Sequence, residues 1–224
     1  MCREVRFMKK KKVVVFDFDG TLCDSFPLVV GKMTEALTEF RKEPLTEEES
    51  KNLYGPTEEG IIYRLFKDKG IAKECFTRYL SLYSRDHEKM LPSFYPGILD
   101  LLKELKTKNI HVYLLTGRCK ETTSITLSKF DAFDYFKAIY TGGIDGEVKE
   151  IRLNELCETH HYKPEELIYI GDSLRDVPQC RKANVDIFSV CYLNMSNKEQ
   201  LEEINPNNVC STVEDLRNKI LSLF

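Results

Sequence analysis

The sequence predicts an α/β fold: a Rossmann-like, mostly parallel sheet core with helices on both faces, plus an inserted α-helical cap domain. Strand-length apolar stretches alternate with helical segments after residue 93, and such alternation is typical of a parallel sheet covered on both faces. Residues from about 24 to 92 contain no convincing strand and interrupt the alternation directly after the first strand. We therefore expect an α/β core formed by 1–23 and 93–224, and a helical cap formed by 24–92.

The first strand is the clearest element of this core. Residues 13–16, Val-Val-Val-Phe, are consecutive β-branched or aromatic residues, which is typical of a strand buried on both faces. The run is too short for a globular helix and far too short to span a membrane. Asp17 and Asp19 come directly after it, so the strand ends in a pair of carboxylates.

The other elements follow from hydrophobic periodicity and from Gly and Pro breaks. Thr46 with Glu49 forms a good helix-capping signal, whereas Thr57 with Gly60 forms a poor one. Helices are expected in the cap over 28–42, 46–53, 57–68 and 72–89. Further strands are expected over 110–116, 138–140, 167–170, 186–190 and 208–210. Helices of the core are expected over 98–108, 120–129, 150–161, 174–183 and 213–223.

Composition and charge exclude several classes of protein. The chain has 224 residues, of which 42% are hydrophobic and 31% charged, as in soluble globular proteins of one or two domains. A net charge of −3 offers no electrostatic case for a nucleic-acid partner, and the basic run 9–12 is expected to be a solvated arm. No stretch of 18 apolar residues occurs, so no membrane partner is expected, and the start is too charged for a secretory signal.

The cysteines indicate a reducing compartment. Eight are present at irregular spacing and none forms a C-x-x-C pair, so we expect reduced thiols and a cytoplasmic location. Cys157 and His161 are helix neighbours, but no second ligand pair lies nearby in the sequence, and a zinc site is not expected. The sequence does not decide between a monomer and a dimer.

The two aspartates after the first strand are the first candidate functional residues. Side chains alternate along an extended segment, so Asp17 and Asp19 share a face if the strand continues through both. Two acids at the end of a buried strand are costly unless they share a cation or a proton. In open α/β sheets this end of the strands is where ligands bind. The alternative interpretation is an ordinary acidic turn.

Two further candidates lie at the end of the next strand and at the start of the helix expected over 150–161. Thr116 and Gly117 end the strand over 110–116, where a hydroxyl and free backbone N–H groups can hold a phosphoryl oxygen. Arg118 comes next and either reaches a substrate or faces solvent. Lys149 stands at the start of a helix, where an exposed surface role is the alternative.

The last candidate is the stretch Gly171-Asp172-Ser173-Leu174-Arg175-Asp176. A glycine ends the strand, and Asp172 and Asp176 are four residues apart, which places them on one face of the following turn. An Asp in the position of Asp172 is equally typical of a helix N-cap.

Taken in order, these motifs resemble those of the haloacid dehalogenase-like hydrolases. The series is Asp-Phe-Asp-Gly-Thr at 17–21, a strand ending in Thr116, the later Lys149, and Gly-Asp-Ser with a further Asp at 171–176. The resemblance covers residues 12–222 and includes Tyr95-Pro96-Gly97, which is similar to the return from a helical cap in that family. The stretch 19–25, with Gly55-Pro56 in the cap, is similar to its phosphoglycolate phosphatase-like members.

The resemblance implies a phosphatase that acts through an aspartyl-phosphate. Asp17 would be the nucleophile, and Asp19 the general acid for the leaving alcohol and then the base that activates water. Thr116 and Lys149 would hold the phosphoryl oxygens, with Gly117 and Arg118 as further substrate-binding candidates. The expected partner is a small phosphorylated metabolite.

The resemblance also implies Mg²⁺ as the cofactor. Asp17, the backbone carbonyl of Asp19, and Asp172 would bind it, and Asp176 would support the metal directly or through water. Oxygen ligands suit a hard ion such as Mg²⁺. A charge count agrees, because four aspartates leave the site strongly negative until one lysine and a divalent cation balance them.

Two alternatives remain open. A sugar phosphomutase of the β-phosphoglucomutase type would share the core and cap, but mutases of this type commonly carry a His after the first motif, and residues 26–31 contain none. A catalytically silent binding module would keep the fold without the activity. One departure from the family pattern is Glu150, where many relatives have proline after the lysine, and Lys137 is therefore a second candidate for the lysine of that pattern. Asp24, Ser25, Tyr54 and Gly55 are candidates for cap residues that contact the substrate.

Overall fold

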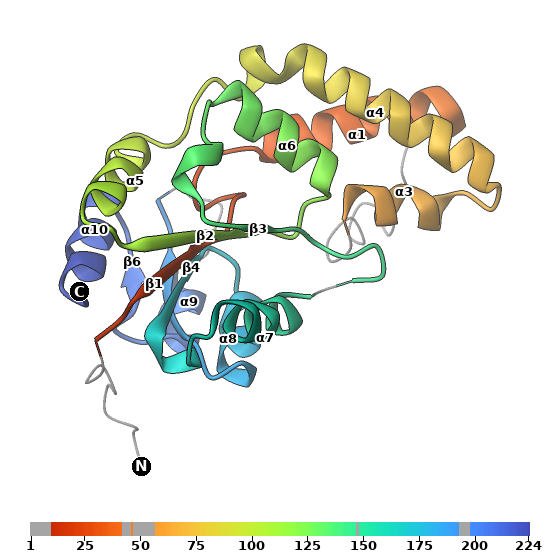
Figure 1. Ribbon diagram of the computed structural model, residues 1–224. Coiled ribbons are helices and arrows are strands. Elements are labelled where there is room, and N and C mark those ends of the chain that lie inside the picture. The colour runs from red at the N-terminus through yellow and green to blue at the C-terminus, as the bar shows by residue number, and fades with distance from the viewer. Residues whose placement is uncertain (1–9, 42–45, 47–56, 147, 193–197) are drawn as a thin grey trace.

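The computed structural model describes residues 10–41, 46, 57–146, 148–192 and 198–224, which form a six-stranded sheet with helices on both faces (Figure 1). The strand order is β3-β2-β1-β4-β5-β6, and every adjacent pair is parallel. The α/β class expected from the sequence is thus confirmed. The strands are β1 (Val13–Phe16), β2 (His111–Leu115), β3 (Ile139–Tyr140), β4 (Leu167–Gly171), β5 (Asp186–Val190) and β6 (Val209–Cys210).

The helices occupy the intervals between the strands and the long insertion after β1. The insertion contains α1 (Phe26–Arg41), α3 (Glu58–Leu65) and α4 (Lys69–Met90). The helices of the core are α5 (Ile98–Thr107), α6 (Lys120–Lys129), α7 (Lys149–His160), α8 (Asp176–Lys182), α9 (Lys198–Ile204) and α10 (Val213–Leu221). The described residues also form two 3₁₀ turns, η1 (Phe133–Tyr135) and η2 (Pro164–Glu166). The helix expected over 46–53 lies, apart from residue 46, outside the described residues.

Side-chain alternation along β1 divides the interior into two cores. Val14 and Phe16 face one core, which α5, α6 and α10 cover, while Val13 and Val15 face the other, which α7 and α8 cover. All four side chains are fully buried. This is the period-2 pattern of a strand with helices on both faces.

The helices of the insertion extend the first core. In Figure 1, α1 and α4 lie beyond α6, on the side away from the sheet. Buried residues of α1 and α4, such as Leu28 and Tyr79, belong to the same apolar cluster as Phe16. The Tyr83 hydroxyl of α4 lies 2.7 Å from Thr126 Oγ1 of α6, so a polar contact also joins the two layers.

Element boundaries differ from expectation where side chains bond the backbone. α4 begins at Lys69 rather than 72, because the Asp68 carboxylate accepts hydrogen bonds from the Gly70 and Ile71 N–H groups. α8 begins at Asp176 rather than 174, because the Asp176 carboxylate accepts from Ser173 N–H and holds the preceding residues in a turn. α9 was not expected, since only its Leu201 is buried and no apolar stripe marks it.

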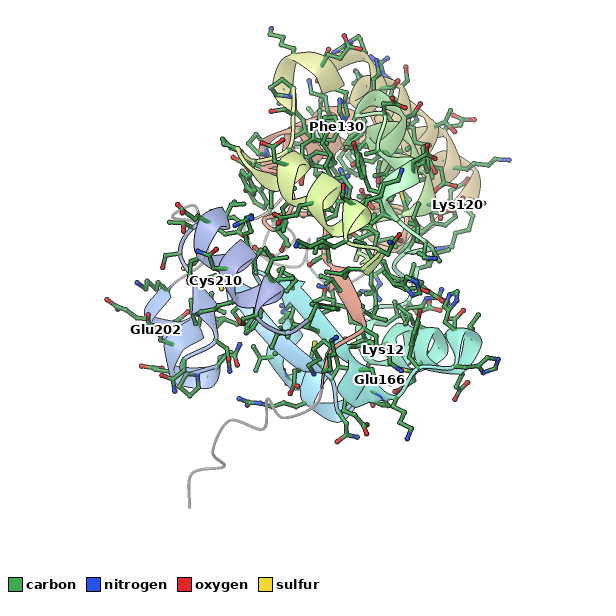
Figure 2. All side chains as sticks on the ribbon, turned by 60° about the vertical axis from the view of Figure 1, so that its left-hand side comes forward. Lys12, Lys120, Phe130, Glu166, Glu202 and Cys210 are labelled. Carbon is green, nitrogen blue, oxygen red and sulfur yellow. The ribbon has the colours of Figure 1, made fainter. Side chains whose placement is uncertain are left out.

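An ion pair joins the segments that precede β1 and β4, at the amino ends of these strands. Figure 2 shows Lys12 and Glu166 beside each other below the strands, and Lys12 Nζ lies 2.6 Å from Glu166 Oε1. The seven cysteines in the described residues are free. Of the helices described, none is both long enough and apolar enough to cross a bilayer.

Candidate active site

The carboxyl ends of β1 and β4 form the centre of the site. The two strands are neighbours, and the chain connections leave them toward opposite edges of the sheet, which is the point where open α/β sheets bind ligands. Pairing continues one residue past β1, because Asp17 N–H donates to Ile170 O at 2.8 Å. Asp17 and Asp172 are therefore brought to the same edge from positions far apart in the chain.

Lys149 joins two of the buried carboxylates. Its Nζ lies 2.6 Å from Asp17 Oδ2 and 2.5 Å from Asp176 Oδ1. Asp17 is 6% exposed and Asp176 is 1% exposed, so this is a buried charge cluster. The structure thus places Lys149 against the aspartates, while Lys137, the second candidate, is exposed.

Three carboxylates in this cluster lie close enough together to hold a metal ion. One oxygen from each of Asp17, Asp172 and Asp176 lies within 4.8 Å of the others. Two glycines make room for them. A Cβ on Gly20 would lie 2.1 Å from Asp172 Oδ2, and a Cβ on Gly171 would lie 2.2 Å from Asp176 Oδ2. Asp172 is not the N-cap of α8, because that position is Arg175.

The charge in this cluster is only partly balanced by Lys149. Burial raises the pKa of Asp17 to about 7, with Lys149 opposing the rise and Asp176 adding to it. Burial, followed by the charges of Asp17 and Asp176, raises the pKa of Asp172 to about 8. Burial disfavours the charged form of Lys149, but Asp17 and Asp176 raise its pKa well above the usual value. The three acids offer only oxygen ligands, and a single lysine does not balance their charge. Both properties fit the binding of Mg²⁺.

Asp19 lies apart from these three carboxylates. Its Oδ1 accepts a hydrogen bond from the Ser25 hydroxyl and lies 3.4 Å from Arg118 Nε. Its side chain is 42% exposed, in contrast to the buried Asp17. The two aspartates therefore have different partners, one a lysine and the other a serine and an arginine. Ser25, a candidate for contact with substrate, is fully buried.

The turn after β2 presents backbone groups next to a hydroxyl. Thr116 is fully buried, its N–H donates to Tyr140 O at 3.0 Å, and its Oγ1 accepts from Arg118 N–H at 3.2 Å. A Cβ on Gly117 would meet nothing within 4 Å, so this residue borders open space. A Cβ on Gly142 would lie 2.2 Å from Gly117 O, so the loop before Lys149 packs directly on this turn.

Arg118 is buried beneath the inserted helices rather than facing solvent. It is 2% exposed, its Nη1 donates to Thr126 Oγ1 at 3.2 Å, and its Nη2 donates to the Tyr83 hydroxyl. Its Nε lies between Asp19 Oδ1, at 3.4 Å, and Glu58 Oε1, at 3.8 Å. The guanidinium thus joins α4, α6 and the Asp19 turn.

The comparison with family models decides the family. A model described as haloacid dehalogenase-like hydrolase matches residues 14–190. The chain belongs to this family. It is accordingly an enzyme, and the activity class expected from the sequence, phosphoric monoester hydrolase, is also the class of its curated relatives.

Three similar proteins illustrate the relationship. Phosphoglycolate phosphatase of Synechococcus elongatus is 24% identical over 215 residues, covering 95% of this chain and 99% of the relative. Phosphoglycolate phosphatase of Nitrosospira multiformis is 28% identical over 189 residues, covering 81% and 83%. A solved structure described as a predicted phosphatase from Clostridium acetobutylicum is 26% identical, covers 96% of this chain and 99% of that one, and superposes with a TM-score of 0.74.

Sequence reasoning missed the residues that join the insertion to the family core. Glu58, Tyr83 and His87 come from α3 and α4 and are buried against α6. A buried carboxylate at a helix start has no distinctive sequence pattern. The one sequence signal for the start of α3 was the capping motif at Thr57. This cap does form, with Thr57 Oγ1 accepting from Gly60 N–H at 3.2 Å.

Proposed function

We propose that the chain is a Mg²⁺-dependent phosphatase that hydrolyses a small phosphomonoester through an aspartyl-phosphate on Asp17. The observation that carries the proposal is the position of Lys149 Nζ, 2.6 Å from Asp17 and 2.5 Å from Asp176, beside a third carboxylate. A nucleophilic carboxylate needs neighbouring positive charge before it can approach a phosphate dianion, and Lys149 supplies part of it.

In the first step, an Asp17 oxygen attacks phosphorus. A bond forms between Asp17 and phosphorus while the bond from phosphorus to the leaving oxygen breaks. Asp19 donates its proton to that leaving oxygen, which departs as an alcohol. The separate surroundings of the two aspartates support this division, since Asp17 is held by Lys149 whereas Asp19 is more exposed and bonded to Ser25.

In the second step, Asp19 accepts a proton from water, and the water oxygen attacks phosphorus. The bond between phosphorus and Asp17 breaks, which releases inorganic phosphate and restores both side chains to their starting states. Thr116, the backbone of Gly117 and Lys149 hold the equatorial phosphoryl oxygens. Arg118 lies beneath the turn over residues 116–119, and its guanidinium balances the charge of the Asp19 carboxylate.

Asp17, Asp172 and the Asp19 carbonyl would hold Mg²⁺, with Asp176 supporting it; the ion would neutralise charge on the phosphoryl oxygens. The fit rests on the three clustered carboxylates and on the raised pKa values of Asp17 and Asp172.

We further propose that residues 24–92 act as a cap that closes over the phosphoryl group and excludes water. The contact between Thr57 N–H and Gly143 O, at 3.2 Å, supports this, because it joins the insertion to the loop before Lys149. Phosphoglycolate is the first substrate to test, since the curated relatives are named phosphoglycolate phosphatase.

Phosphate release from p-nitrophenyl phosphate tests the proposal. We expect activity that requires Mg²⁺, disappears with a chelator and returns on adding the ion. Asp17→Asn keeps the shape of the side chain and should lower kcat by about 10³-fold or more. Acid-quenched wild-type protein should yield a phosphorylated peptide that contains Asp17. A folded Asp17→Asn variant with full activity would contradict the proposal.

Assays of the same protein also test the two alternative functions, a sugar phosphomutase and a binding module. Interconversion of sugar phosphates that depends on a bisphosphate activator, with little phosphate release, would identify a mutase. Substrate binding without turnover across phosphoglycolate, sugar phosphates and nucleotides would identify a binding module.

A further inference from the structure

Glu58 is a buried acid that belongs to the insertion but bonds only to the core among the contacts described. It is the first residue of α3 and is 4% exposed. Its Oε2 accepts from Cys119 N–H at 2.7 Å, and its Oε1 accepts from the Thr122 hydroxyl at 2.6 Å. Both donors belong to the start of α6, more than sixty positions later in the chain.

The first of these hydrogen bonds satisfies a backbone N–H at the amino terminus of α6, and the second ties Glu58 to a side chain of its first turn. Cys119 is the N-cap of that helix, and its own side chain makes no capping hydrogen bond. A helix start leaves N–H groups without partners and favours a negative charge. Glu58 therefore supplies, from another segment, the acceptor for the N-cap N–H that a Glu at the third helical position, residue 122, would supply in a capping box.

The start of α6 is also the end of the turn that borders the phosphate position. Cys119 follows Thr116, Gly117 and Arg118 directly, and Glu58 Oε1 lies 3.8 Å from Arg118 Nε. A bond to Cys119 N–H thus restrains the far end of this turn. Its near end is restrained by strand pairing, through the bond from Thr116 N–H to Tyr140 O.

The first turn of α3 touches the second loop of the site as well. Thr57 N–H donates to Gly143 O at 3.2 Å, and a Cβ on Gly142 would lie 2.9 Å from Thr57 Cγ2 and 2.2 Å from Gly117 O. The same loop leads to Lys149. Thr57 and Glu58 together therefore contact both segments that carry the proposed phosphate-holding groups.

We propose that Glu58 is a positioning residue: its carboxylate caps α6 only when α3 is docked, and this docking orders the turn over residues 116–119 for phosphate binding. The inference rests on the proposed function for its consequence on activity, but not for the docking itself. Undocking α3 breaks the hydrogen bonds that Cys119 N–H and the Thr122 hydroxyl donate to Glu58, and it removes one of the two acids beside Arg118. The binding turn then becomes mobile before substrate arrives.

Hydrogen exchange tests the docking without reference to activity. In Glu58→Ala, the amides in a peptide covering 116–123 should exchange about tenfold faster or more, because a hydrogen bond to a charged group is lost. Glu58→Gln keeps an acceptor for Cys119 N–H and should restore much of that protection. Arg64→Ala is the matched control. It removes a different contact of α3 with the core, the hydrogen bond from Nη2 to Asp145 O at 2.6 Å, and should leave exchange over 116–123 unchanged.

Kinetics with p-nitrophenyl phosphate test the consequence. Glu58→Ala should raise KM and the inhibition constant of inorganic phosphate in parallel by about tenfold, and lower kcat less, because phosphate binding is lost in ground and transition states alike. Unchanged exchange over 116–123 in folded Glu58→Ala would overturn the inference. So would an equal acceleration in Arg64→Ala. An inactive wild type would instead contradict the proposed function and leave the exchange result to decide the docking.

Discussion

Gly20 lies against the carboxylate of Asp172, so that a Cβ on Gly20 would stand 2.1 Å from Asp172 Oδ2. The φ of Gly20 is +70°, a left-handed conformation that other residues adopt at a cost. The turn after β1 and the end of β4 therefore fit together only because position 20 has no side chain.

Gly20→Ala should disable the site while leaving the fold intact. The methyl group must displace the Asp172 carboxylate, and a displacement of this size at a reacting centre can lower the rate by about 10²-fold. The left-handed conformation should add a loss of about 1–2 kcal/mol in the free energy of unfolding. Activity with p-nitrophenyl phosphate and urea unfolding measure the two effects.

Gly97→Ala is the matched control for that variant. Gly97 also has a positive φ, +88°, and its Cβ would meet Val213 Cγ1 at 3.2 Å, away from the site. It should lose similar stability but keep its kcat. Equal losses of activity in the two variants would show that strain, and not the Asp172 contact, disables Gly20→Ala.

Lys149→Met should lower kcat/KM by about 10²- to 10³-fold. It removes the cation that bonds Asp17 and Asp176, and such charge stabilisation is typically worth that much to a reaction. Because Lys149 lowers the pKa of Asp17, its removal should also keep Asp17 protonated to higher pH. Lys137→Met, at the exposed second candidate, should retain wild-type rates. If the two variants prove equally active, Lys149 has no part in the reaction.

Mg²⁺ binding should release protons near neutral pH. The pKa of Asp17 is raised to about 7 and that of Asp172 to about 8, so the metal-free protein holds protons that a metal must displace. Affinity should therefore weaken by at least about tenfold from pH 8 to pH 6. Titration calorimetry in buffers of different ionisation enthalpy counts the protons released.

The same raised pKa values predict how the stability of the metal-free protein depends on pH. A carboxyl whose folded pKa is raised stabilises the fold below its ordinary pKa and loses that contribution as pH rises through the folded value, here from about 4 to about 8. Asp172→Asn should reduce both this trend and the proton release. Mg²⁺ binding without proton release at pH 6.5 would contradict a metal site formed by Asp17 and Asp172.

His87 should make the fold sensitive to acid. Burial, with the nearby charges of Arg118 and Lys129, lowers the pKa of His87 to about 4. Its Nε2 lies 3.1 Å from Thr126 Oγ1, and Nδ1 has no hydrogen-bond partner among the described residues. Figure 2 marks Phe130, at the end of α6, whose ring packs edge-on against that of His87.

A depressed folded pKa gives stability that is present above the unfolded value, about 6.5, and is lost as pH falls toward 4. Between pH 7 and pH 5 the loss should be about 2 kcal/mol in the free energy of unfolding. His87→Phe keeps an aromatic ring at the position and should remove this component. Urea unfolding at the two pH values, wild type against variant, measures it; the same pH dependence in both would show that His87 is not responsible.

Several elements could be predicted because local pattern alone determines them. β1 and β5 occur at their expected residues, since short segments with β-branched and aromatic residues between turns favour a strand over a helix. Asp17 and Asp172 could be expected near each other because the carboxyl ends of neighbouring parallel strands meet at one edge. α9 could not, because its single buried residue leaves no periodicity to detect.

Chain order and residue type were enough to indicate the sheet, its acidic edge and the family, since each depends on neighbours in sequence or on strand ends that must converge. Only the tertiary structure decided which groups surround Arg118, that Glu58 caps α6, and that Asp19 stands apart from the other three aspartates. Those contacts join α3, α4 and α6 across long loops. Their energies depend on burial and on distances of a few ångströms, which no local pattern encodes.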